Sequence, residues 1–175
     1  MDIINIFAPQ LYAIHYKNEA LDAYNKCIDN WTDVEYVRRF VKDHQADIEG
    51  RDLNQVVEEI IEDAEDIDDI LYELSNSTDA SINEFFAPLR NSEYQVKLLS
   101  RQKGRVNRKS YTRIYGIRIE SDCYVITGGA LKFTQFMKDR EHTYQELKNI
   151  DKVRDFLIDN EIIDQDNLED FHTQQ

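Results

Sequence analysis

The clearest pattern of apolar and polar positions is a pair of runs rich in β-branched and aromatic residues, at 111–119 and 123–133. They flank the polar residues 120–122, so the pattern predicts a β-hairpin. In the first run, alternate residues point to opposite faces of the strand, and both faces carry apolar side chains, which is typical of a central strand. Arg113 and Arg118 interrupt this run, and a guanidinium in a sheet favours a carboxylate or phosphate partner.

Further apolar alternation extends this hairpin into a sheet. We expect an α+β fold in which a small, mainly antiparallel sheet has helices packed on one face. Thr127, Gly128 and Gly129 permit a bulge in the last strand. The polar, basic segment 100–110 is expected to be an exposed loop between strands. The expected strands are residues 11–16, 94–99, 111–119 and 123–133.

Apolar residues at intervals of three and four predict the helices. The clearest is residues 53–74, a long helix inserted before the hairpin, with Asp52 as its N-cap and an almost entirely acidic outer face. Its Glu-x-x-Glu spacing is compatible with a metal site, but no histidine accompanies it, so we favour a solvated acidic face and expect no metal. The other helices are expected in residues 19–28, 34–41, 82–89 and 143–157, with capping boxes at Ser81/Glu84 and Thr143/Glu146.

We expect one domain over residues 1–175. It would comprise an N-terminal strand and helical extension (1–80), a core (81–160) and an acidic tail (161–175). The formal charge of -14 is unevenly distributed. From Lys97 to Arg140 the net charge is +8, which leaves -22 for the rest. This asymmetry indicates a basic site for a polyanion, although a solvated basic loop is an equally open interpretation.

Several function classes find no support in the sequence. The two cysteines, Cys27 and Cys123, lie in a predicted helix and strand and do not indicate a disulfide or zinc site; a reducing compartment suits them. A secretion signal and an apolar run long enough to cross a bilayer are missing, so we expect a cytoplasmic protein without membrane association. Neither a phosphate-binding loop, a dinucleotide fingerprint, a zinc-protease motif nor a nucleophile elbow occurs, and no cofactor is expected.

The remaining chemistry is arginine, lysine and tyrosine beside a sheet. Such residues can hold phosphates, stack on bases and stabilise the phosphorane that forms when a ribose 2′-hydroxyl attacks its own phosphodiester. The motifs Y-T-R-I-Y-G-I-R-I and C-Y-V-I-T-G-G-A-L-K-F-T-Q, followed by a capped helix, resemble RelE/ParE-type toxins, especially the HigB-like and phage-related branch. The resemblance covers about residues 82–157.

The resemblance implies a metal-independent endoribonuclease that cleaves messenger RNA, at the ribosome, as the toxin of a toxin-antitoxin pair. Arg113 matches the arginine of the family's Y-R-I strand and Lys132 the basic position after its last strand, so these two are the expected catalytic residues. The implied partners are RNA, the ribosome and a helix-turn-helix antitoxin protein. The expected RNA-binding side chains lie in the basic segment or the central strand: Arg101, Lys103, Arg105, Arg108, Lys109 and Arg118.

The chain also departs from the family pattern. The usual tandem lysine is reduced to Lys132-Phe133, and His142 and Tyr144 come later than the catalytic position requires. These departures favour an alternative, a RelE-like protein that binds a partner protein or RNA without cleaving it. A purely structural acidic protein is a third possibility. We further expect that acids of the 53–74 helix, if they lie near the 101–109 segment, compete with phosphate for its bases.

Overall fold

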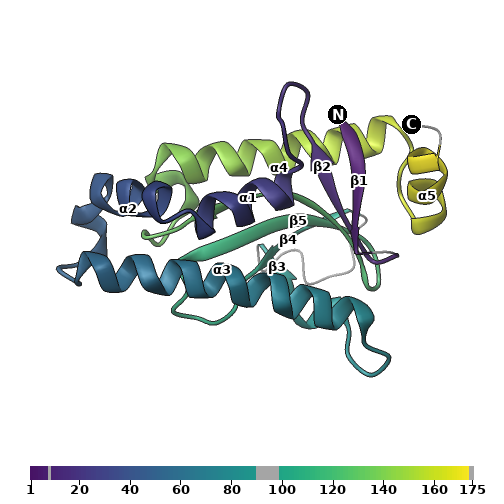
Figure 1. Ribbon diagram of the computed structural model, residues 1–175. Coiled ribbons are helices and arrows are strands. Elements are labelled where there is room, and N and C mark those ends of the chain that lie inside the picture. Colours follow the sequence, from purple (N-terminus) through teal and green to yellow (C-terminus); the bar gives the residue numbers. More distant parts are fainter. Residues whose placement is uncertain (8, 90–98, 174–175) are drawn as a thin grey trace.

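The computed structural model describes residues 1–7, 9–89 and 99–173. Within them, one six-stranded mixed sheet has the order β1-β2-β6-β5-β4-β3 (Figure 1). All neighbouring pairs are antiparallel except β2 and β6, which are parallel. The strands are β1 (Asp2–Phe7), β2 (Leu11–His15), β3 (Phe86–Pro88), β4 (Ser100–Gly104), β5 (Thr112–Glu120) and β6 (Cys123–Leu131). The helices are α1 (Ala23–Thr32), α2 (Val34–Asp43), α3 (Leu53–Asn76), α4 (Glu141–Asp159) and α5 (Gln165–Thr173), with 3-10 turns η1 (Gln45–Ile48), η2 (Ile82–Glu84) and η4 (Met137–Asp139).

The expected hairpin is present as β5 and β6. Glu120 pairs with Cys123 across a two-residue turn, in which Asp122 has a φ of 64°. Asn, Asp and Gly tolerate this left-handed conformation better than other residues do. The register shifts between Tyr115 and Gly116, which leaves Thr127 as the extra residue of the predicted bulge.

The α+β class is confirmed, but helices cover both faces of the sheet rather than one. Helices α1, α2 and α3 pack on one face around a core that includes Trp31 and Ile60, while α4 and α5 pack on the other around Ile150 and Leu168. Figure 1 shows α3 and α4 running along opposite sides of the sheet. The reason is visible in β5 and β6, whose two registers are both apolar and therefore both require cover.

The long helix α3 forms as the sequence pattern predicts. Asp52 caps it, because its side chain accepts the Gln55 backbone N–H at 2.9 Å. Its apolar stripe, with Ile60 and Ile67 fully buried, packs on α1 and α2. The acids Glu58, Glu62, Glu65 and Asp69 are exposed, as a solvated face requires.

Two short segments fold differently from expectation. The capping box of Ser81 and Glu84 exists, yet only one 3-10 turn follows before the chain enters β3. Phe86 is then buried and stacks on Tyr124 with ring centroids 4.5 Å apart, so strand pairing with β4 replaces the expected helix over 82–89.

The first half of the predicted loop at 100–110 is strand β4. Its side chains alternate between buried and half-buried, and Gly104 leaves room for Phe85, whose ring carbon Cε1 would lie 2.0 Å from an added Cβ. The sequence pattern misses this strand because its half-buried positions are basic. Except for Leu99, the strand expected at 94–99 lies outside the described residues.

The start of α4 differs from the expectation. The predicted Thr143/Glu146 capping box is wrong, because α4 begins earlier, at Glu141, and the Thr143 hydroxyl donates to the Arg140 carbonyl at 3.0 Å. The acidic tail forms α5, in which Leu168 is fully buried. No helix in the described part of the chain has both the length and the apolar content that crossing a membrane requires.

We expect Ile60→Ala to lower the free energy of unfolding by about 2–5 kcal/mol, because Ile60 is fully buried between α3 and its neighbours. Urea denaturation would measure it. The matched control is Ile158→Ala on α4, where the side chain is 50% exposed and the change should stay within about 0.5 kcal/mol. Equal losses in the two variants would contradict the packing of α3 described above.

Candidate nucleic-acid interface

The strand registers bring basic side chains from three strands to one face of the sheet. Lys103 pairs with Tyr115 and Arg113 pairs with Ala130, and both Tyr115 and Ala130 belong to the core on the α4 side. Lys132 lies two residues beyond Ala130, so it continues on the same face. These cations therefore gather where β4, β5 and β6 meet.

A cavity of about 530 Å³ opens over this end of the sheet. We call it the cationic cleft. Lys103, Arg105, Arg113 and Lys132 line it, together with Asp139. The remaining lining residues are Leu89, Tyr115, Gln135, Phe136, Met137, Lys138 and Leu147.

Within the described residues, none of the four cations at the base of the cleft forms an ion pair with a carboxylate. Arg113 donates to the carbonyls of Ser110 and Thr112, the latter at 2.6 Å, and Lys132 donates to the carbonyl of Gln135. Arg105 has one long bond of 3.5 Å to the Arg108 carbonyl. Carbonyl partners orient a cation but carry no opposing charge. Asp139 and Asp63 act on Lys132 and Arg113 without forming ion pairs with them, so the cleft keeps a net positive charge.

The pKa values of these groups reflect burial and mutual repulsion. Burial, followed by the neighbouring Arg105, lowers the pKa of Arg113 to about 10. Burial lowers the pKa of Lys132 as well, and the charges of Arg113 and Lys103 add to the effect. The pKa of Lys103 is lowered by burial and then by Arg105 and Arg113. An anion that entered the cleft would reverse these shifts, because it would stabilise the charged forms.

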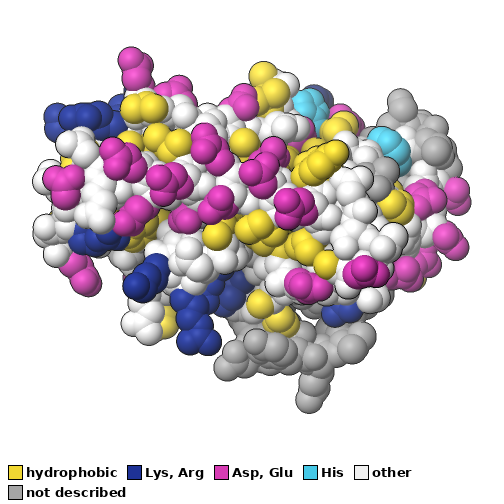
Figure 2. Space-filling model, turned by 60° about the horizontal axis from the view of Figure 1, so that its bottom comes forward, with side chains coloured by type: hydrophobic (Ala, Val, Ile, Leu, Met, Phe, Trp, Pro, Cys, Tyr) yellow, Lys and Arg dark blue, Asp and Glu magenta, His cyan; other side chains and the backbone are white. Residues whose placement is uncertain are grey.

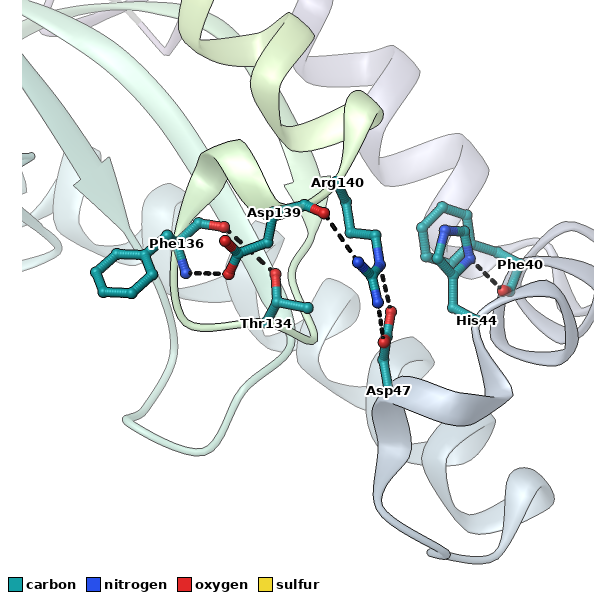
Figure 3. Close-up of polar contacts among 7 residues, drawn as sticks. All are labelled: Phe40, His44, Asp47, Thr134, Phe136, Asp139 and Arg140. Carbon is teal, nitrogen blue, oxygen red and sulfur yellow. Dashed lines mark hydrogen bonds and ion pairs between the residues drawn. The ribbon is translucent and has the colours of Figure 1, made fainter.

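The rim of the cleft is a turn that is fixed at several points (Figure 3). The Phe136 N–H donates to Asp139 Oδ2 at 2.9 Å, and the Thr134 hydroxyl donates to the Phe136 carbonyl at 3.3 Å. Arg140 binds both carboxylate oxygens of Asp47, with Nε at 2.8 Å from Oδ2, and ties the turn to the 3-10 segment after α2. The Phe136 ring points away from these contacts and is 62% exposed.

The structure separates the expected site residues into two groups. Lys103, Arg105, Arg113 and Lys132 meet in the cleft. The others lie outside its lining. Arg101 is on the same face of the sheet but pairs with Asp151 of α4 at 2.7 Å.

Arg108 and Lys109 are exposed on the segment after β4. Arg118 pairs in register with Ser100 and Tyr124, so it lies on the opposite face, where its Nε donates to the Glu120 carbonyl at 3.2 Å. The last contact explains how a guanidinium is accommodated within the sheet without a carboxylate.

The acidic helix approaches the basic segment through residues other than the exposed acids. Asp63 is half-buried beside Ser110, and its charge acts on Arg113; burial raises the pKa of Asp63, and the hydrogen bond from Ser110 opposes that. Glu59 pairs with Arg51 at 2.6 Å. Figure 2 shows acidic side chains spread over the α3 surface and Lys and Arg side chains gathered along its lower edge. Competition between helix acids and phosphate thus stays a prediction, with Asp63 as its best-placed residue.

His142 and Tyr144, which follow the last strand in the sequence, do not line the cleft. His142 Nε2 is 2.8 Å from the Leu131 carbonyl, and its ring packs against Phe40 of α2. Tyr144 lies beside Lys148 on α4. Sequence reasoning missed Phe136, which follows Gln135 in the segment after the last strand and has no distinguishing pattern around it.

The chain was compared with protein-family models, curated proteins and solved structures, and it matches none of them. Membership in the RelE/ParE superfamily therefore stays a prediction that rests on the short motifs quoted above. In residues 1–7, 9–89 and 99–173, no group of three or more His, Cys, Asp or Glu is placed to hold a metal ion.

Replacing Arg113 with glutamine should raise the pKa of Lys132 and of Lys103. Burial would remain, but a repelling charge that lowers both values would be gone. Titration of the lysine side chains by NMR, with 13C-labelled lysine, would measure the shift. The matched control is Arg118→Gln, which removes the same charge on the opposite face and should leave both values unchanged. An unaltered Lys132 pKa in Arg113→Gln would show that the two cations do not share one site.

Proposed function

We propose that the cationic cleft binds the phosphodiester backbone of RNA and that the chain is a metal-independent endoribonuclease of the toxin type. The observation that carries the proposal is that Lys103, Arg105, Arg113 and Lys132, from three neighbouring strands and the residues just after them, line one cavity and form no ion pair with any carboxylate of the described residues. Such a set is expensive to keep folded unless an anion uses it. A phosphate group fits, because a guanidinium and ammonium groups can hold its non-bridging oxygens together.

The roles follow from the chemistry of 2′-hydroxyl attack. Arg113 and Lys132 stabilise the charge that builds on the phosphorane, and Lys103 and Arg105 hold the adjacent backbone. Lys132 has a second use, because a lowered pKa increases the fraction of free amine that can accept the 2′-hydroxyl proton. Attack forms the new P–O2′ bond and breaks the P–O5′ bond, which leaves a 2′,3′-cyclic phosphate and a 5′-hydroxyl.

The second candidate is a protein that binds RNA or a partner protein without cleaving it. One observation favours it: none of the described residues that line the cleft is a histidine. Imidazole is the side chain whose ordinary pKa best suits proton transfer at neutral pH. The two candidates share the cleft and differ only in whether RNA is cut there.

Expression of the intact chain in bacterial cells should arrest growth, and Arg113→Ala and Lys132→Ala should each relieve the arrest. In vitro, RNA cleavage with EDTA present should fall by about 10²- to 10³-fold in either variant, as when a transition-state contact is lost. The assay should be run on free RNA with EDTA and on translating ribosomes without it, because ribosomes need Mg²⁺ to stay assembled. The cyclic phosphate end group is its readout.

The control is Arg118→Ala, which should arrest growth like the unaltered chain. RNA bearing a single 2′-deoxy substitution at the cut site should resist cleavage there. Tight RNA binding without cleavage under every condition would leave the binding protein as the function. Cleavage that survives both Arg113→Ala and Lys132→Ala would remove the cleft from the mechanism.

Phe136 provides a flat apolar surface at the rim of this site, and we expect it to stack on a base next to the bound phosphate. Phe136→Ala should weaken binding of single-stranded RNA by about 1–3 kcal/mol, whereas Phe136→Trp should preserve it. Fluorescence anisotropy with a labelled oligonucleotide would measure both. Tyr72→Ala is the control, since Tyr72 is 57% exposed on α3 and should not affect binding. An oligonucleotide with an abasic site at the stacked position should bind the unaltered protein and the Phe136→Ala variant with equal affinity.

A further inference from the structure

A second cavity, of about 380 Å³, lies at an edge of β6 that has no strand beside it. The parallel strand β2 pairs with β6 only from Tyr124 to Ile126, and the cavity lies along the next residues, 127–131. Helices α1 and α2 contribute to its wall from one side and α4 from the other. It shares no lining residue with the cationic cleft.

Aromatic rings form much of the wall. Tyr16, Trp31, Tyr36 and Phe40 all line the cavity. The π faces of such rings carry partial negative charge and attract cations. Trp31 is also the only tryptophan of the chain.

A carboxyl group without a full set of partners lies among these rings. Glu146 Oε1 accepts from Asn149 Nδ2 at 3.3 Å, whereas Oε2 is buried and has no hydrogen-bond partner among the described residues. The side chain fits because residue 128 is glycine: an added Cβ there would lie 2.2 Å from Oε2. Burial raises the pKa of Glu146 to about 7, against the opposing effects of Asn149 and Lys26.

Two other polar groups of the cavity wall present acceptors. The Tyr16 hydroxyl donates its proton to the Thr127 carbonyl at 2.6 Å and so presents its lone pairs. Because the partner of His142 Nε2 is a carbonyl, Nε2 carries the proton and Nδ1 is an acceptor. Among the cations, Lys26 pairs with Glu19 at 2.8 Å, and Lys17 and Lys152 are exposed. The interior of the cavity therefore offers acceptors and ring faces.

We propose that this cavity binds a small organic cation, with its ammonium or guanidinium group against Glu146 and its apolar body among the aromatic rings. The ligand would supply the donor that Oε2 lacks, and charge-assisted bonds of this kind are stronger than neutral ones. The rings would replace the hydration of the cation. This site is separate from the cationic cleft, and the proposal does not depend on RNA cleavage.

Benzylamine and benzyl alcohol make a matched pair of probes, because they share a ring and differ in charge. At about pH 8, where the Glu146 carboxyl is mostly ionised, benzylamine should change the Trp31 fluorescence saturably. It should bind at least about tenfold more tightly than benzyl alcohol. Equal affinities for the two probes would show an apolar hollow only, and the absence of a saturable response to benzylamine would overturn the proposal.

Glu146→Gln keeps the shape of the side chain and removes its charge, so it should abolish the preference for benzylamine. Glu141→Gln on the same helix is exposed and should retain that preference. Circular dichroism of both variants checks that they fold. A preference that persists in Glu146→Gln would assign the cation site to another group and contradict the proposal.

The pH dependence adds an independent readout. The groups around Glu146 are Lys26 and Cys27 of α1, Tyr16, Tyr115 of β5, and His142 one turn earlier on α4. Burial raises the pKa values of Tyr16, Cys27 and Tyr115, so these stay neutral, and it lowers that of His142. Benzylamine affinity should rise between about pH 6 and about pH 8 as Glu146 ionises, and this rise should vanish in Glu146→Gln. An unchanged rise in that variant would also refute the assignment.

Discussion

The structure depends on strand β6 being packed closely on both faces, and two consecutive glycines make this possible. A Cβ on Gly129 would lie 2.6 Å from Trp31 Cη2 and 2.9 Å from Cys27 Sγ, and one on Gly128 would lie 2.2 Å from Glu146 Oε2. The absence of side chains therefore lets α1 approach from one face and α4 from the other. Lys132 directly follows this strand. The helix packing that positions β6 therefore also positions Lys132 in the cationic cleft.

The hairpin and the long helix could be predicted because their patterns are local. The period of two in β5 and the period of three to four in α3 are complete within each segment. Strand β4 could not be predicted this way, since its half-buried Arg101 and Lys103 read as loop residues. They are held in a strand by their partners in β5, and a local sequence pattern contains no information on that long-range pairing. Helix cover on both faces follows the same logic, because it depends on which segments return to the sheet.

The candidate site was predictable to the extent that it obeys strand alternation. Arg113 is an unusual charge within a strand, whereas Lys132 is indicated only by the family resemblance, and the cleft contains both. Arg118 was grouped with them, although it lies five positions after Arg113, and an odd number of positions along one strand places two side chains on opposite faces. Phe136 had no such signal. Its position is set by Asp139 and by the pair between Arg140 and Asp47, which are 93 residues apart in the sequence.

Within the described residues, the lack of carboxylate ion pairs at the cations of the cleft agrees with the lowered pKa values of three of them. Lys103, Arg113 and Lys132 share a partly desolvated space, so each of these three is less stable in its charged form than it would be in water. Folding alone does not require this, because acids are abundant in a chain of net charge -14 and α3 carries many of them. Of these, the half-buried Asp63 acts on Arg113, and the exposed ones face solvent. The described residues leave the cations of the cleft without carboxylate ion pairs while exposing most of the acids of α3, which lowers stability at this site, and a bound polyanion would restore it there.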